Sequence, residues 1–234
     1  MFKTRVALLS ALALLAVGGI APSAASAAGP YWHLGGHRLE KFSWPALIVA
    51  GPTELKAKVL GIPITIQCLS ATVEGAEIVG NGTSQGLDTA SSVAFEKCTI
   101  ATPKGCVVPQ PIRTVAVKSR LVTYDSGKIG DLFEPAKGTE FVTIKLEDES
   151  KTNTCSLKAE YPVKGSVMAE VAPEGSEAKV GELAFPATAV KQIKEEGGSP
   201  TTIGLEIGKG NPANFSGKFE VEMALGERFG VFAS

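Results

Sequence analysis

Two cysteines that flank a short turn between alternating runs constrain this chain more than any other feature. Before the turn, Val93 and Phe95 share one face of an extended chain, since successive strand side chains point to opposite faces. Residues 102–105 combine a proline with a glycine, which is typical of a turn. Residues 112–118 then resume as a run rich in β-branched side chains. The pattern predicts a disulfide-stapled loop between two β-strands.

Four cysteines occur in the chain: Cys68, Cys98, Cys106 and Cys155. Four cysteines allow three pairings, and sequence alone selects none of them. We expect Cys98 to pair with Cys106, which would close the turn, and Cys68 to pair with Cys155, which would join two distant strands. A metal site built from all four is disfavoured, because such sites use close C-x-x-C pairs and the spacings here are 30, 8 and 49 residues.

The N-terminal segment predicts the compartment. Residues 1–27 begin with Lys3 and Arg5, continue as a short apolar run, and end in a small-x-small motif at Ala25 and Ala27. These are the parts of a secretory signal peptide. We therefore expect residues 28–234 to form one secreted domain, extracellular or at the cell surface, with no stable membrane span after cleavage. An oxidising compartment also suits the two expected disulfides.

Charge argues against one class of partner. Loss of residues 1–27 removes two of the 23 basic residues and none of the 24 acidic ones, which leaves a net charge of −3. Nucleic-acid-binding proteins carry a basic face, so we expect no nucleic-acid partner. No phosphate-binding glycine motif is present in the sequence, and we expect no cofactor.

Short alternating runs separated by turn residues fill the rest of the chain. The clearest run lies near the C-terminus, where Phe219, Val221 and Met223 face one way and charged residues the other. Turn signals recur about every 8 to 12 residues, which is typical of an all-β sandwich. We predict an all-β fold, an antiparallel β-sandwich or jelly-roll-like domain with two disulfides. A closed β-barrel is the alternative, because alternation looks the same in both.

Aromatic residues gather at the start of the expected mature chain. Tyr31, Trp32 and Trp44 could stack on the faces of a sugar, and they are the candidate ligand-binding residues. The favoured alternative is that an N-terminal strand, turning at two glycines, covers one end of the core. The side chains assigned to that cover are Trp32, Leu34, Leu39, Phe42 and Trp44.

The two histidines do not predict a metal site. His33 and His37 have the four-residue spacing of helical zinc motifs, but two glycines lie between them and argue against a helix. No third ligand is nominated by the sequence, and we expect no metal.

A set of short motifs resembles a known family. The motifs are Trp32-x-x-Gly35 with Leu39, Ile66-Gln67-Cys68, Val93-x-Phe95-x-x-Cys98 with Cys106, Ile112-x-Thr114, and Thr154-Cys155 followed by Val163-x-Gly165-Ser166-Val167. Together they resemble a family of uncharacterised, secreted, disulfide-containing β-rich proteins of soil actinobacteria. The resemblance spans nearly the whole mature chain. It implies a secreted β-rich fold and carries over no functional residues.

Three functions are compatible with this sequence. The first is a secreted structural or interaction protein, extracellular or associated with the cell envelope, without catalytic activity. The second is an extracellular carbohydrate-binding module, whose partner would be a cell-wall glycan or another envelope component. The third and least favoured is a secreted hydrolase, since residues 82–86 match a G-x-S-x-G string around Ser84 but both histidines precede that serine. No catalytic residue is nominated.

Overall fold

The computed structural model describes residues 29–81, 85–124, 127–149, 154–187, 192–193 and 201–233. The predicted signal peptide and Ser84 lie outside these residues. Within the described ranges every named element of secondary structure is a β-strand, which confirms the all-β prediction. The described part of the chain contains no helix of the length and apolarity needed to cross a membrane.

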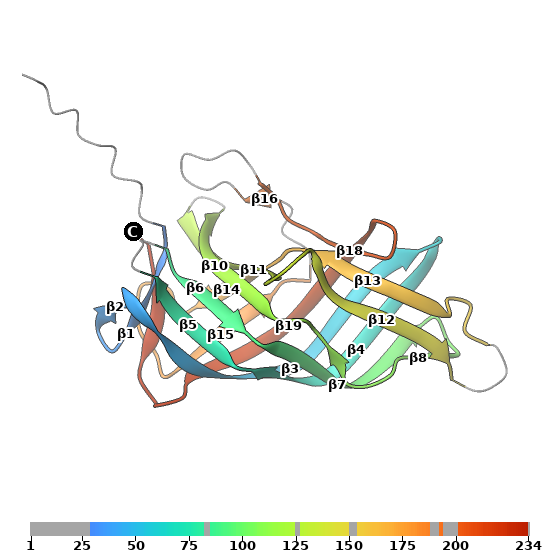
Figure 1. The fold of residues 1–234 in the computed structure, drawn as a ribbon, viewed down its shortest axis with the longest axis horizontal. Coiled ribbons are helices and arrows are strands. Elements are labelled where there is room, and N and C mark those ends of the chain that lie inside the picture. The colour runs from blue at the N-terminus through green and yellow to red at the C-terminus, as the bar shows by residue number, and fades with distance from the viewer. Residues whose placement is uncertain are drawn as a thin grey trace, which may run out of the picture.

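Eight antiparallel strands close into a barrel (Figure 1). The ring closes because the last long strand pairs with the first one, so the structure adopts the closed barrel that was the alternative to a sandwich. In ring order the strands are β3 (Lys41–Val59), β5 (Ala76–Asn81), β6 (Leu87–Ala90), β10 (Val117–Tyr124), β11 (Lys128–Pro135), β14 (Val167–Ala172), β15 (Val180–Phe185) and β19 (Asn211–Met223).

Strands β3 and β19 are longer than the barrel and carry a second sheet beyond it. β3 and β19 pair with each other along one edge. Along its other edge β3 pairs with β5 inside the barrel and with β4 beyond it, while β19 pairs with β15 inside the barrel and with β18 beyond it. This second sheet is the open lobe, because within the described residues its outer strands do not pair. Its further strands are β9 (Ile112–Arg113), β7 (Ser92–Thr102), β4 (Ile62–Glu74), β18 (Leu205–Ile207), β13 (Ala159–Gly165), β12 (Glu140–Asp148) and β8 (Cys106–Val107).

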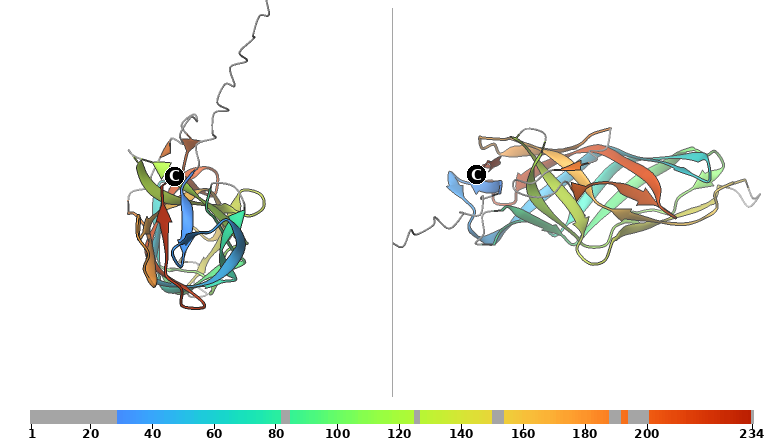
Figure 2. Two further views of the ribbon diagram at one scale, coloured as in Figure 1. Left: turned by 90° about the vertical axis from the view of Figure 1, so that its left-hand side faces the viewer. Right: turned by 90° about the horizontal axis from the view of Figure 1, so that it is seen from above.

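A small sheet lies across the barrel end that is farther from the open lobe (Figure 2). In it β1 (Tyr31–Leu34) pairs with both β2 (His37–Arg38) and β20 (Phe229–Phe232). Trp32, Phe229 and Val231 are buried members of the barrel core, so this end sheet closes the barrel with apolar side chains. The remaining hairpin joins β16 (Gln192–Ile193) to β17 (Thr201–Thr202).

All four cysteines form disulfides, as predicted, but the predicted pairing is wrong. Cys68 bonds to Cys98, and Cys106 bonds to Cys155. The reason is register: β7 continues past Cys98 to Thr102 alongside β4, which places Cys98 directly opposite Cys68. After the turn Cys106 enters β8, which pairs with β12, and Cys155 follows β12 in the chain. Both disulfides therefore lie in the open lobe.

The two largest apolar cores lie in the barrel and in the open lobe. A third, smaller cluster consists of Val122, Tyr124, Leu132, Met168, Ile193 and Ile203. Four partly buried side chains pack against both cores and form the junction between them: Phe95, Phe133, Val167 and Phe215. Inward-facing residues alternate with exposed ones along β19, as the sequence pattern predicted.

Candidate functional site: a carboxyl pair in an apolar cavity

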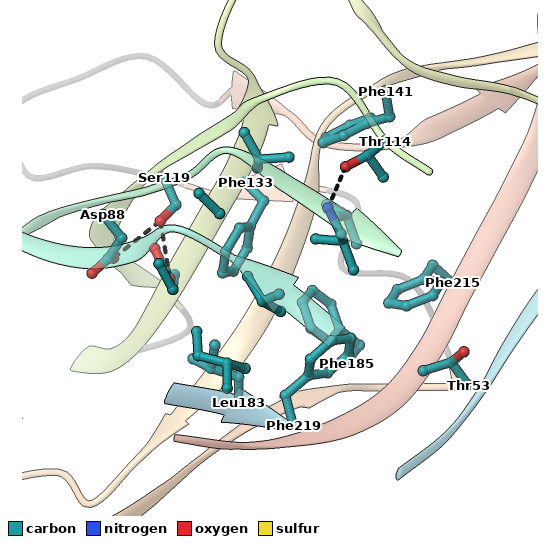
Figure 3. Close-up of a pocket in the computed structure, with 18 of the residues that line it drawn as sticks. Thr53, Asp88, Thr114, Ser119, Phe133, Phe141, Leu183, Phe185, Phe215 and Phe219 are labelled. Atoms are coloured by element: carbon teal, nitrogen blue, oxygen red, sulfur yellow. Dashed lines mark hydrogen bonds between the residues drawn. The ribbon is translucent and has the colours of Figure 1, made fainter. Parts of the chain in front are cut away.

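A cavity of about 180 Å³ lies within the barrel and extends across the junction to the open lobe (Figure 3). Its wall is almost wholly apolar. Figure 3 places Asp88 and Ser119 at one end of the cavity and Phe141 with Thr114 at the other. An apolar cavity of about 150 Å³ is large enough to hold benzene, so this cavity has room for a small organic molecule.

Phenylalanine rings form the middle of the cavity wall. Phe185 is the central ring, with its centroid 5.1 Å from that of Phe215, 5.4 Å from that of Phe219 and 5.5 Å from that of Phe133. The first two contacts are edge-to-face, the geometry that aromatic rings prefer. The rings come from three strands, β11, β15 and β19, each of which directs alternate side chains inward. These four residues are called the phenylalanine cluster below.

Two carboxyl groups and a hydroxyl interrupt this apolar wall. Asp88 on β6 and Asp131 on β11 flank Ser119 on β10, the strand between them. The Ser119 hydroxyl lies 3.0 Å from Asp88 Oδ2 and 3.1 Å from Asp131 Oδ2. Asp131 is only 1% exposed, and it is the one charged residue among the fully buried side chains that the structure describes. The two aspartates are called the carboxyl pair below.

Burial is the main reason that both carboxyl groups of the pair have raised pKa values. It raises the pKa of Asp131 to about 7, against the lowering effects of hydrogen bonds from Ser119 and Asp88. Burial also raises the pKa of Asp88 well above its usual range, and the neighbouring charge of Asp131 raises it further. The pair therefore retains protons at pH values where exposed aspartates have lost theirs.

Three polar atoms around the pair make no hydrogen bond of ordinary length and angle with the described residues, although Trp32 and Asp131 lie close enough to act on the pKa of Asp88. They are Oδ1 of Asp88, Oδ1 of Asp131 and Nε1 of Trp32, and all three are buried. Trp32 lies beside Asp88, and its indole lowers the pKa of that carboxyl. Buried polar atoms are paired in most proteins, because leaving one unpaired costs about 1 to 3 kcal/mol. Unpaired atoms on a cavity wall are positioned to meet a ligand.

Gly86 explains how Trp32 reaches this position. A Cβ at Gly86 would lie 2.9 Å from Trp32 Cδ1 and 2.6 Å from Leu121 Cδ1. Both distances are shorter than side chains tolerate, so only glycine lets the indole pack against the barrel wall here. This glycine accommodates an aromatic ring.

The structure separates the three predicted stacking residues. Trp32 is 3% exposed and belongs to the barrel core. Tyr31 precedes it on β1 and so faces the other way, where it is partly exposed against Phe232, with the Arg38 guanidinium 4.1 Å from its ring centroid. Trp44 on β3 is half-buried against the barrel core. The three do not form one binding platform.

The alternative interpretation of this segment is correct in outline. Trp32 covers one end of the barrel core, and Leu34, Leu39 and Trp44 pack against the same core. Phe42 is the exception: it is 81% exposed and has a φ of +76°, which bulky side chains rarely adopt.

The histidines are distant from any metal-binding arrangement. His33 Nδ1 lies 3.1 Å from Glu177 Oε1, and the backbone amide of Gly36 donates to the same carboxylate. No group of three or more histidine, cysteine or acidic side chains in the described ranges is arranged to hold a metal ion.

Sequence reasoning missed the carboxyl pair. The available signal was Asp131 itself, which shares the alternating face of Ile129 and Phe133. An acid at an apolar position of a strand indicates either an exposed edge or a buried functional group.

Comparisons of this chain with protein-family models, with curated proteins and with solved structures yield no match. The functional assignment therefore rests on the cavity and the groups that line it.

Proposed function

We propose that this chain is an extracellular, non-catalytic interaction protein whose barrel binds a small apolar molecule. The observation that carries the proposal is the cavity of about 180 Å³ that begins inside a closed barrel and extends into the open lobe. An eight-stranded barrel has an interior that is either filled by side chains or holds one small ligand. Here the phenylalanine cluster leaves part of the interior unfilled, as ligand-binding barrels do.

Two features support the extracellular part of the proposal. Disulfides persist in oxidising compartments, and this chain uses all four of its cysteines in two of them. Residues 1–27 also have the sequence pattern of an export signal. Membership of the secreted actinobacterial family that the sequence resembles, and association with the cell envelope, belong to the same proposal.

The surroundings of Ser119 support a binding role over catalysis. A serine nucleophile needs a base that removes its proton, and histidine is the usual one. Ser119 instead contacts two carboxyl groups whose pKa values are raised, while His33 and His37 lie on the end sheet. The hydroxyl and the carboxyl pair thus form a polar patch in a binding cavity.

Calorimetric titration with ethylbenzene tests the proposed function. We expect the purified, oxidised protein to bind about one equivalent. Leu183 lines the cavity, so Leu183→Trp should fill the space and abolish binding. Leu47→Trp adds the same bulk at a 59% exposed position of β3 and is the matched control. Absence of ethylbenzene binding to the wild-type protein, or equal binding by both variants, would contradict the proposal.

A carbohydrate-binding role is the second candidate, and Tyr31 is the observation that favours it. Its ring is partly exposed on the end sheet beside Phe232 and Arg38, an aromatic and basic surface of the kind that contacts sugars. Co-sedimentation with cell envelopes, before and after digestion of the wall glycan, tests this role. Tyr31→Ala should abolish glycan-dependent binding; unchanged binding would exclude Tyr31 as the contact.

A further inference from the structure

The carboxyl pair gives the cavity one polar end. Asp88 and Asp131 contribute to the cavity wall, and each has a buried Oδ1 that accepts no hydrogen bond from the described residues. The phenylalanine cluster makes the middle of the cavity apolar, and at the opposite end the hydroxyl oxygen of Thr114 already accepts a hydrogen bond from the backbone amide of Val93. A ligand that fits this cavity would place a hydrogen-bond donor at the pair and an apolar body along the rings.

No positive charge of the described residues balances the pair. Neither carboxylate forms an ion pair there. Three other charged residues contribute to the cavity wall: Glu77, Lys118 and Glu182. Each alternates with inward-facing neighbours, so its charge points to the outside of the barrel. Buried carboxylates without a counter-charge are costly, and a cation that reaches them removes much of that cost.

We propose that the cavity binds a small apolar amine, whose ammonium group donates hydrogen bonds to Asp88 and Asp131 while its apolar body packs against the phenylalanine cluster. This inference rests on the proposed function, because it needs the cavity to admit a ligand. It adds the chemical class of that ligand.

An ammonium group fits the pair better than a neutral head group does. It carries several N–H donors, enough to serve both unpaired carboxylate oxygens, whereas a hydroxyl has one. It also brings the positive charge that the site lacks, and charge-assisted hydrogen bonds are about twice as strong as neutral ones. Binding of the cation favours the ionised pair, so the amine displaces protons that burial retains. Amine affinity should therefore rise from pH 6 to pH 8.

Paired titrations of benzylamine and ethylbenzene test the inference, because the two molecules have the same shape and differ in charge. We expect the oxidised wild-type protein at pH 7.5 to bind benzylamine at least about 10-fold more tightly, the scale of a charge-assisted hydrogen bond. Asp88→Asn and Asp131→Asn should each lower benzylamine affinity by at least that factor and change ethylbenzene affinity by a much smaller factor. Glu182→Gln is the matched control, since it removes an outward-facing carboxylate of the same wall.

Any one of three results would overturn the inference. If ethylbenzene binds and benzylamine binds no more tightly, the cavity is apolar in function and the amine assignment fails alone. If neither molecule binds, the proposed function fails with it. An NMR titration of the wild-type protein needs no variant: benzylamine should shift the indole N–H signal of Trp32 and leave that of Trp44 unchanged. A shift of neither signal would also overturn the inference.

Discussion

The barrel and the open lobe share two strands, yet they are stabilised in different ways. The barrel is a closed ring of hydrogen-bonded strands, and its interior contains the carboxyl pair. The open lobe has unpaired edges in the described residues, contains all four cysteines in two disulfides, and has no buried acid among its described residues. Covalent links thus occur where the sheet is open, and costly polar groups occur where it is closed.

This contrast assigns a task to each half. A closed ring exposes no strand edge, so it retains its shape around a partly unfilled, partly polar interior. An open sheet lacks that closure, and its two disulfides instead link neighbouring parts of it covalently: β4 to the adjacent β7, and β8 to Cys155, which follows the adjacent β12 in the chain. Four perturbations test whether the two halves are as different as this contrast implies.

The largest effect is expected from loss of a disulfide. Replacing Cys106 and Cys155 with serine opens a loop whose ends are 49 residues apart, which lowers the free energy of unfolding by about 4 kcal/mol in the loop-entropy model. Hydrogen exchange should show lost protection in β8 and β12, with β10 and β11 unchanged. The Cys68 and Cys98 double variant, with a separation of 30 residues, is the comparison. Equal loss of protection in both halves would show that they unfold together.

A cavity-enlarging change in the barrel comes next. Phe185→Ala removes the central ring of the phenylalanine cluster, and truncations of this kind cost about 3 to 5 kcal/mol. We expect a loss of about 3 kcal/mol, at the lower end of that range, because the ring already borders an unfilled space. Urea unfolding measures the change. A loss of less than about 1 kcal/mol would mean that the barrel collapses around the gap.

Replacing a buried acid in the barrel should stabilise it. The pKa of Asp131 is raised to about 7 in the folded protein, above its usual value in an unfolded chain of about 3.9. The folded state then binds more protons than the unfolded state between about pH 4 and pH 7, so stability falls as pH rises through this window. Asp131→Asn removes that loss and should raise the free energy of unfolding at pH 8 on the order of 2 kcal/mol.

Urea unfolding at pH 4 and pH 8 measures this effect of Asp131→Asn. The difference between variant and wild type should grow from pH 4 to pH 8, and Asp148→Asn in the open lobe serves as the control. The pKa of Asp148 is lowered, mainly by its hydrogen bond from Lys158, so its loss should change stability in the opposite direction. A pH-independent effect of Asp131→Asn would contradict the account of the pair.

The smallest effects concern two strained residues, one in each half. Leu60, at the hairpin tip between β3 and β4, has a φ of +52° and precedes Gly61 with a φ of +82°. Asparagine followed by glycine is the preferred sequence for such a turn, so Leu60→Asn should stabilise by about 1 kcal/mol. Phe42→Asn, at a φ of +76° in the barrel half, is the matched change. Equal shifts in the urea midpoint would indicate one cooperative unit; destabilisation by either would contradict the strain argument.

Sequence patterning predicted the strand content and failed where partner choice decides the outcome. The alternation of Phe219, Val221 and Met223 predicted β19 because one face of that strand is wet. The same alternation occurs in sandwiches and barrels, so closure through β3 and β19 could not be inferred. The disulfide pairing failed for a related reason, since the register that opposes Cys68 to Cys98 is set by long strands and not by the nearby turn.

The candidate site was less predictable than the fold. Strand β11 has buried residues on both faces, so it lacks the alternation that marks a half-buried strand. The sequence pattern therefore did not identify β11 as a strand, and an acid at position 131 did not stand out as buried. Trp32 was identified as notable, and its burial decides between the core and the sugar-stacking interpretations of that residue.

The pairing of β3 with β19 also governs how this chain reaches its fold. The ladder joins Ala57 to Ala213, positions 156 apart in the sequence, and neither half is complete until it forms. Contacts between such distant segments require closure of a long loop before they contribute stability, so all-β chains of this kind fold in milliseconds to seconds. Until then β3 can pair only with β4 and β5 on its other edge, and one edge of each future half stays unpaired. Folding speed, and exposure to aggregation on the way, are therefore set by one late encounter between two strands.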